Sequence, residues 1–122
     1  MSDPSSLVDE TGRVVVERCE RAERLGERMR GLLGRDGLEP GTGLWIAKTG
    51  SVHTFFMRFP MDAVFLDKGL RVRKVVTAVK PFRLSWSRGA RSVIELAAGE
   101  AARVGLVEGM QLSWHDQTHV GE

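Results

Sequence analysis

Short segments in which apolar and polar positions alternate recur along the chain, and they predict strands. Three consecutive valines lie in the stretch from Arg13 to Cys19, which alternates in part, and Met110, Leu112 and Trp114 alternate with polar neighbours near the other end. Side chains two positions apart on a strand share a face, so this is the period of a half-buried strand. Apolar runs of strand length predict further strands at 44–47, 52–57, 63–66, 71–79 and 92–96.

A different period follows the first predicted strand. From Glu20 onward, Ala22, Leu25 and Met29 recur at steps of three and four, and charged residues occupy the positions between them. This spacing places the apolar side chains on one face of a helix. The sequence therefore predicts an amphipathic helix from about residue 20 to Gly34, because glycine readily takes the left-handed conformation that ends a helix. A further short helical turn is expected within 99–104.

Glycine and proline residues mark the loops and turns between the predicted elements. Loops are expected at 35–43 and 81–90, and Asp67-Lys68-Gly69 is predicted to be a hairpin turn with Gly69 at positive φ. Six or seven short strands and one clear helix indicate a mainly β, or α+β, fold. We expect a compact β sandwich or barrel-like sheet with one amphipathic helix near the N-terminus. A single domain is predicted over 13–114, between a disordered segment 1–12 and a flexible tail 115–122.

Composition adds little to this picture. A chain of 122 residues with 42% hydrophobic and 28% charged residues is expected to fold as one globular domain without metals, cofactors or disulfides. The formal net charge of +2 is too small to indicate a nucleic acid or a membrane as partner by itself. The lone Cys19, the absence of a recognisable signal sequence and the lack of a long apolar run together predict a cytoplasmic protein with no membrane span.

The common catalytic signatures are absent from the sequence. There is no glycine-rich phosphate loop, no G-x-S-x-G, no C-x-x-C and no H-E-x-x-H. Cys19 lies in no recognisable thiol motif, so we expect it to be structural. His115 and His119 are four residues apart, but a stable metal site needs three or four fixed ligands, so no metal site is predicted.

The segment 52–62 is the densest in chemistry, since it mixes phenylalanines and methionines with His53, Arg58 and Asp62. On a structural interpretation, Asp62 accepts backbone N–H bonds at a turn and His53 satisfies a neighbouring carbonyl. On a functional one, the three polar side chains line an aromatic-walled pocket that holds a small or anionic ligand, with Glu95 opposite. A non-catalytic binding module of this kind is our first hypothesis, and an enzyme that uses His53 and Asp62 as an acid/base pair is another.

The distribution of charge carries a signal that the total hides. Residues 68–94 contain eight basic and no acidic side chains, a formal charge of +8. Phe82 and Trp86 are interleaved with these cations, and the combination of charge and stacking surface suits single-stranded nucleic acid or another polyanion. The alternative is a solvated hairpin whose charges are balanced in space by acidic residues elsewhere. The candidate polyanion-binding residues are Arg71, Arg73, Lys74, Lys80, Arg83, Trp86, Arg88 and Arg91.

The run from His53 to Asp67, followed by Gly69, resembles the central motif of a prokaryotic family known as domain of unknown function 192. The segments 30–35, 43–46 and 93–99 are similar to further motifs of that family, so the resemblance spans roughly residues 13–113. It implies a compact β sandwich or barrel-like fold with one helix, and no established activity. Many relatives carry tryptophan and asparagine where Phe56 and Phe59 stand here. The positions that match the family pattern are His53, Met57, Pro60, Asp62, Asp67, Glu95 and Gly99.

Overall fold

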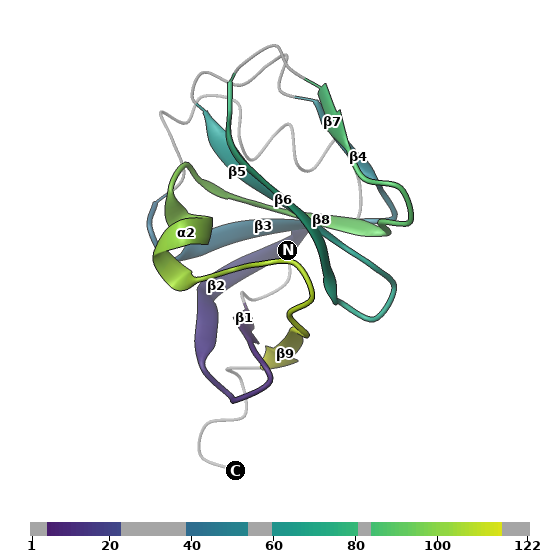
Figure 1. The fold of residues 1–122 in the computed structure, drawn as a ribbon. Coiled ribbons are helices and arrows are strands. Elements are labelled where there is room, and N and C mark those ends of the chain that lie inside the picture. The colour runs from purple at the N-terminus through teal and green to yellow at the C-terminus, as the bar shows by residue number, and fades with distance from the viewer. Residues whose placement is uncertain (1–4, 23–38, 54–59, 81–83, 116–122) are drawn as a thin grey trace.

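The computed structural model describes residues 5–22, 39–53, 60–80 and 84–115, and this part of the chain is mainly β (Figure 1). The first four strands are β1 (Ser5–Val8), β2 (Val14–Ala22), β3 (Thr42–Ala47) and β4 (Ser51–His53). They are followed by β5 (Met61–Leu66), β6 (Val72–Val79), β7 (Leu84–Trp86) and β8 (Ser92–Ala97). The helix α2 (Glu100–Val104) and the strand β9 (Ser113–His115) complete the described elements.

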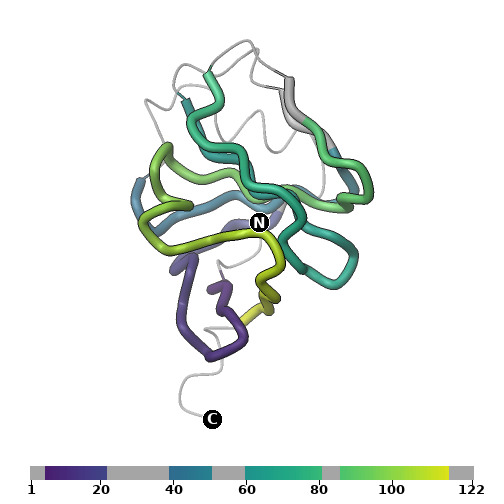
Figure 2. Tube along the Cα trace, in the orientation of Figure 1, coloured from purple at the N-terminus to yellow at the C-terminus, as the bar shows by residue number. Residues whose placement is uncertain are grey.

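Within these residues, seven strands form one sheet in the order β6-β5-β8-β3-β2-β1-β9, and β4 pairs with β7 in a separate two-stranded sheet. The pairing of β2 with β3 is parallel and the other neighbours run antiparallel. Figure 2 shows the purple N-terminal segment beside the yellow β9, as the β1–β9 pairing requires. The mainly β class is thus confirmed.

The expected β sandwich or barrel-like sheet is not found, because the large sheet stays open between its edge strands β6 and β9. What joins the two edges is an isolated bridge between Arg71 and Gln111, with hydrogen bonds such as Val72 N–H to the Met110 carbonyl at 2.9 Å. These contacts involve Arg71 and Val72 at the start of β6 and the residues that precede β9. The start of β6 is therefore tied to the loop before β9 without a continuous ladder.

The sheet buries side chains on both faces, which explains why all six residues of β5 are buried. Val64 and Ile94 belong to the larger core, which also contains Ala101 of α2, so α2 covers this face. Ala63 and Phe65 belong to a second core on the other face. Because neighbouring positions on a strand alternate between faces, each residue of β5 and β8 can be assigned to one side of the sheet.

The predicted helix near the N-terminus is wrong at its start. Glu20–Ala22 continue β2, where Glu20 is paired with Leu44 and Ala22 with Ile46 of β3. The remainder of that prediction, residues 23–34, lies outside the described residues. The short helical turn expected within 99–104 is present as α2. A local helical period at 20–22 is overridden here by pairing with a strand about twenty residues further along the chain.

The folded part of the chain also begins before residue 13, where the sequence had placed the domain boundary. Ser5–Val8 form β1 between β2 and β9, with Leu7 completely buried. Ser6 Oγ donates a hydrogen bond to the Glu17 carbonyl at 2.9 Å. A four-residue strand that begins with two serines shows almost no alternation of apolar and polar residues, so the sequence pattern does not predict it. At the other end, β9 includes His115, which had been assigned to the tail.

The predicted hairpin turn after β5 is present, but its left-handed residue is Leu70 (φ 68°) and not Gly69. Leu70 N–H donates to the Asp67 carbonyl at 3.0 Å, and the Asp67 carboxylate accepts the N–H groups of Gly69 and Arg71, each at 2.9 Å. A type I turn followed by one left-handed residue has this arrangement. The carboxylate of Asp67 organises the turn, so glycine at position 69 is not required for its φ.

Candidate functional site

Two of the four predicted ligand-binding residues can be placed in full. Arg58 lies outside the described residues, and His53 is described only as part of the backbone of β4, opposite Leu84 of β7. Asp62 and Glu95 lie on the adjacent central strands β5 and β8, and both are fully buried. The geometry of these two carboxylates therefore decides what can be said of the cluster.

Asp62 holds three backbone amides. Its Oδ1 accepts the N–H of Ala78 at 2.9 Å, and its Oδ2 accepts the N–H groups of Gly99 and Ala101 at 3.1 and 2.9 Å. Gly99 is the N-cap residue of α2, and no side chain of α2's own segment caps it, so Asp62 does so from β5. Ala78 has a φ of 52° at an irregularity in the pairing of β5 with β6. These hydrogen bonds agree with the structural interpretation of the sequence, in which Asp62 accepts backbone N–H bonds at a turn.

Glu95 faces the other side of the sheet. In the pairing of β5 with β8, Asp62 stands opposite Leu96, whereas Ala63 stands opposite Glu95. Leu96 belongs to the core under α2 and Ala63 to the second core. Directly opposed residues share a face, so the Asp62 and Glu95 carboxylates project from opposite faces of the sheet. These two groups do not form a paired acid/base site with each other.

The ligand pocket and the acid/base pair stay predictions, because both depend on the side chain of His53. In the part of the chain that the structure describes, no group of three or more His, Cys, Asp or Glu residues could hold a metal ion. No helix in that part is long and apolar enough to cross a membrane.

The basic segment, by contrast, has a definite arrangement around the turn that follows β7. Lys74 Nζ donates to the carbonyl of Trp86 at 2.9 Å, and Arg73 Nε donates to the carbonyl of Arg88 at 3.1 Å. Two adjacent cations of β6 thus reach across to the backbone of 86–88. Trp86 itself is 62% exposed, the largest exposed fraction among the large hydrophobic residues described.

The turn itself is anchored on both sides. Ser87 N–H donates to the Gly50 carbonyl at 3.0 Å, and Ala90 N–H closes the turn on the Ser87 carbonyl at 3.2 Å. Gly89 has a φ of 81°, and a Cβ built there would lie 3.1 Å from the guanidinium carbon of Arg73. The left-handed backbone therefore favours glycine at 89, and a side chain there would also displace the Arg73 guanidinium slightly.

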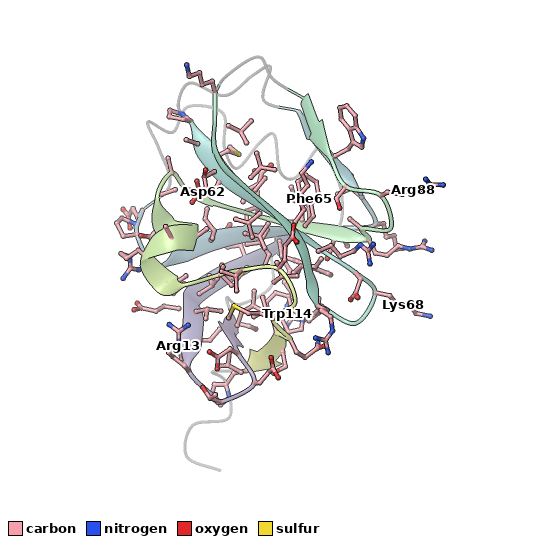
Figure 3. The ribbon with its side chains drawn as sticks, viewed as in Figure 1. Arg13, Asp62, Phe65, Lys68, Arg88 and Trp114 are labelled. Carbon is pink, nitrogen blue, oxygen red and sulfur yellow. The ribbon has the colours of Figure 1, made fainter. Side chains whose placement is uncertain are left out.

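Arg91 joins this region through its backbone. Its N–H donates to the carbonyl of Leu66 at 2.7 Å, which places it beside the end of β5 and the turn that contains Lys68. Figure 3 shows Arg88 and Lys68 projecting outward on the same side of the view, with Arg13 on the other side. We call the group formed by Arg73, Lys74, Trp86, Arg88 and Arg91 the Trp86 surface.

The other three candidates of the basic segment are not part of this group. Arg71 Nη1 donates to the Gly109 carbonyl at 2.6 Å and so lies toward the loop before β9. Lys80 follows the far end of β6, seven residues from Arg73, which is about 23 Å along an extended strand. Arg83 lies outside the described residues. The predicted eight residues thus divide into one cluster of five and others that are placed elsewhere or not described.

In the described part of the chain, no carboxylate is paired with a cation of the Trp86 surface. Among the described residues, none forms an ion pair with Arg73, Lys74, Arg88 or Arg91, whereas Arg13 and Arg103 elsewhere are paired with Asp9 and Glu100. The backbone carbonyls take one N–H from each of Arg73 and Lys74. An arginine has five N–H donors and a lysine three, so both side chains keep donors for another anion.

Sequence reasoning missed two clusters that join distant segments. Arg21 lies over the Trp114 ring, 3.8 Å from its centroid, and Trp45 meets Trp114 edge-on at 5.5 Å. These residues belong to β2, β9 and β3, and no local spacing relates them. The pattern could not have revealed this contact without knowledge of the strand order.

The second cluster surrounds Glu100, the first residue of α2. Its carboxylate accepts two hydrogen bonds from Arg103, at 2.6 and 2.8 Å, and one from Gly41 N–H at 2.7 Å. The hydrogen bonds from Arg103, followed by that from Gly41, hold the pKa of Glu100 below its ordinary value against the opposing effect of burial. This cluster ties the loop before β3 to α2 and is structural.

The comparisons with known proteins agree with the fold. The profile of the DUF192 family, described as an uncharacterized ACR, matches residues 7–114. A protein of unknown function from Novosphingobium aromaticivorans DSM 12444 has a similar structure with a TM-score of 0.76 and 24% identity, over 91% of this chain and 84% of that one. A Sinorhizobium meliloti 1021 protein described as "a putative transcription regulator" has a TM-score of 0.78 and 23% identity, over 92% of both chains. No curated protein matches the sequence.

Proposed function

The chain belongs to the DUF192 family, and we propose that it binds a phosphate-bearing polyanion through the Trp86 surface. The observation that supports the proposal is the convergence of Arg73, Lys74, Arg88 and Arg91 around one anchored turn, with no carboxylate paired to them among the described residues. Cations concentrated on one surface create an attractive potential for polyanions even when the net charge of the protein is small.

The fixed position of the cations favours binding over mere solvation. A long side chain in solvent loses rotamer freedom when it contacts a ligand, and this loss weakens binding. Arg73 and Lys74 have already lost much of that freedom, because each is held by a backbone carbonyl of the 86–88 segment. Their remaining donors therefore contact a phosphate with a smaller entropic penalty than free surface lysines would.

A small-ligand site around His53, Arg58, Asp62 and Glu95 has weaker support. Asp62 is engaged by three backbone amides, and Glu95 projects from the opposite face of the sheet. We place the proposed binding activity in the cytoplasm, where a lone reduced cysteine and phosphate polyanions both occur.

Fluorescence anisotropy with a fluorescein-labelled polyphosphate and a labelled 20-nucleotide DNA tests the proposal. Binding at low salt is expected to weaken steeply as salt is added, because each neutralised phosphate releases counterions. With four cations in contact, the slope of log K against log salt on a single strand is about −3.

The double variant Arg73→Gln/Arg88→Gln is expected to weaken binding at least tenfold. The matched control is Arg13→Gln/Arg103→Gln, which removes the same charge from two exposed arginines that lie outside the Trp86 surface. Equal losses in the two double variants would mean that binding follows net charge and not this surface. Absence of binding to either probe at low salt would overturn the proposal.

A further inference from the structure

Trp86 is unusual in its surroundings, and the cations alone do not explain it. It is 62% exposed at the end of β7, although tryptophan is normally buried over most of its surface. The carbonyl of Trp86 accepts a hydrogen bond from Lys74 Nζ at 2.9 Å, and the N–H of the next residue, Ser87, donates to the Gly50 carbonyl at 3.0 Å. The ring is thus displayed from a backbone that is fixed on two sides.

The described residues that directly follow Trp86 in the chain offer no large apolar side chain. Ser87 is half-buried, and Arg88 and Gly89 after it are exposed. The other large hydrophobic residues that are exposed in the described part of the chain, Val14 and Val107, lie at the start of β2 and in the loop after α2. Among the residues whose side chains are described, no other exposed large hydrophobic residue lies on the 86–91 segment, so the exposed ring there provides a stacking face next to cationic residues without the wider apolar patch that insertion into a membrane would use.

We infer that the polyanion bound at the Trp86 surface is a single-stranded nucleic acid, with an unpaired base stacked on the Trp86 ring and its phosphates on Arg73, Lys74 and Arg88. This inference rests on the proposed function and specifies its ligand. Every base has a flat π face, and a single strand can turn that face outward, whereas a duplex keeps its bases stacked on each other. The adjacent cations then contact the phosphates on either side of the stacked base.

The experiment compares four probes in the same buffer: a 20-nucleotide oligothymidylate, an abasic 20-mer of equal charge, a 20-base-pair duplex, and vesicles of phosphatidylcholine with phosphatidylserine. The wild-type protein is expected to bind oligothymidylate at least fivefold more tightly than the abasic strand. Trp86→Ala is expected to lower the affinity for oligothymidylate and to remove this preference, and Trp86→Phe is expected to keep most of it. Because Trp86 is largely exposed, the variants should retain the wild-type melting temperature, which is checked first.

The outcomes separate the inference from the proposed function. Equal binding of oligothymidylate, abasic strand and duplex, unaffected by Trp86→Ala, would leave polyanion binding standing and overturn the single-strand assignment. Trp86-dependent binding to vesicles without binding to any nucleic acid would overturn the assignment in favour of a membrane surface. Failure to bind any of the four probes would overturn both.

Discussion

Asp62 joins three segments that are far apart in the chain. The amides that it accepts belong to residues 16, 37 and 39 positions away, in β6 and at the start of α2. Asn at this position has a single acceptor oxygen, and its NH₂ would face an N–H donor, so buried amides would lose their partner. Asp62→Asn is expected to lower the free energy of unfolding in urea by about 2 to 4 kcal/mol.

Asp67→Asn is the matched control for this prediction. Asp67 also accepts two backbone amides, but these hydrogen bonds are exposed to solvent, so its substitution is expected to cost under about 1 kcal/mol. Equal losses for the two variants would show that the burial of Asp62 adds nothing to the value of its hydrogen bonds.

Cys19 is completely buried in the larger core, and burial raises the pKa of its thiol to about 12. At pH 8 the folded protein therefore holds about one thiolate in ten thousand, and the thiolate is the reactive form. We expect iodoacetamide to leave native Cys19 unmodified over an hour and to alkylate it quickly in urea, as followed by mass spectrometry. Native labelling at the rate of the unfolded chain would contradict this inert, structural role.

At the scale of single residues, the sequence indicated which residues carry chemistry but not which of them meet. The capping role of Asp62 was among the structural alternatives, yet its partners could not be named, because they lie on elements brought together only by the fold. The proximity of Arg73 to Arg88 could not be predicted from the sequence for the same reason. The two residues are fifteen positions apart in the chain, and the turn at Gly89 brings the carbonyl of Arg88 to the guanidinium of Arg73.

At the scale of elements, α2 offers a pH-dependent test. The pKa of Glu100 is lowered in the folded protein, chiefly by the hydrogen bonds from Arg103. A lowered folded pKa gives stability that is present above the unfolded value and is lost as pH falls through the folded value. Glu100→Gln is therefore expected to cost roughly 1 kcal/mol at neutral pH, a modest figure because Arg103 is exposed to solvent.

This cost is expected to shrink as the pH falls below about 4.3, where Glu100 of the unfolded chain begins to take up a proton while the folded protein still holds the charge. Urea unfolding of both proteins at several pH values measures it. Glu108→Gln, at an exposed glutamate, controls for the change in net charge. A cost that stays constant down to pH 3 would mean that the charge of Glu100 contributes nothing to the free energy of unfolding.

The strands were predictable to different degrees, and the reason lies in their surroundings. β5, β6 and β8 were anticipated within two residues, because they contain continuous or alternating apolar runs. β1 was missed, since its first residues are serines that the sheet pairs through the backbone. Glu20–Ala22 were assigned to a helix because apolar residues begin to recur there at steps of three and four. In the structure these residues continue β2, because they pair with the parallel strand β3.

At the scale of the whole molecule, the near-neutral total of +2 conceals a separation of charge. Paired residues such as Arg103 with Glu100 balance each other around α2, whereas the Trp86 surface has no carboxylate partner among the described residues. Like charges held together disfavour the folded state, and a bound polyanion relieves this repulsion. The thermal stability of the protein should therefore respond to polyanions.

A ligand that binds only the folded state stabilises it by about 2.7 kcal/mol at a concentration of about 100 times Kd. For a domain of this size each kcal/mol raises the melting temperature by about 4 °C, so the corresponding rise is about 10 °C. We expect polyphosphate at low salt to produce such a rise, followed by differential scanning fluorimetry, and neutral dextran at equal mass to produce none. The rise should shrink in Arg73→Gln/Arg88→Gln and persist in Arg13→Gln/Arg103→Gln. A rise of the same size in both double variants would place the binding outside the Trp86 surface, because only the first of them removes its cations.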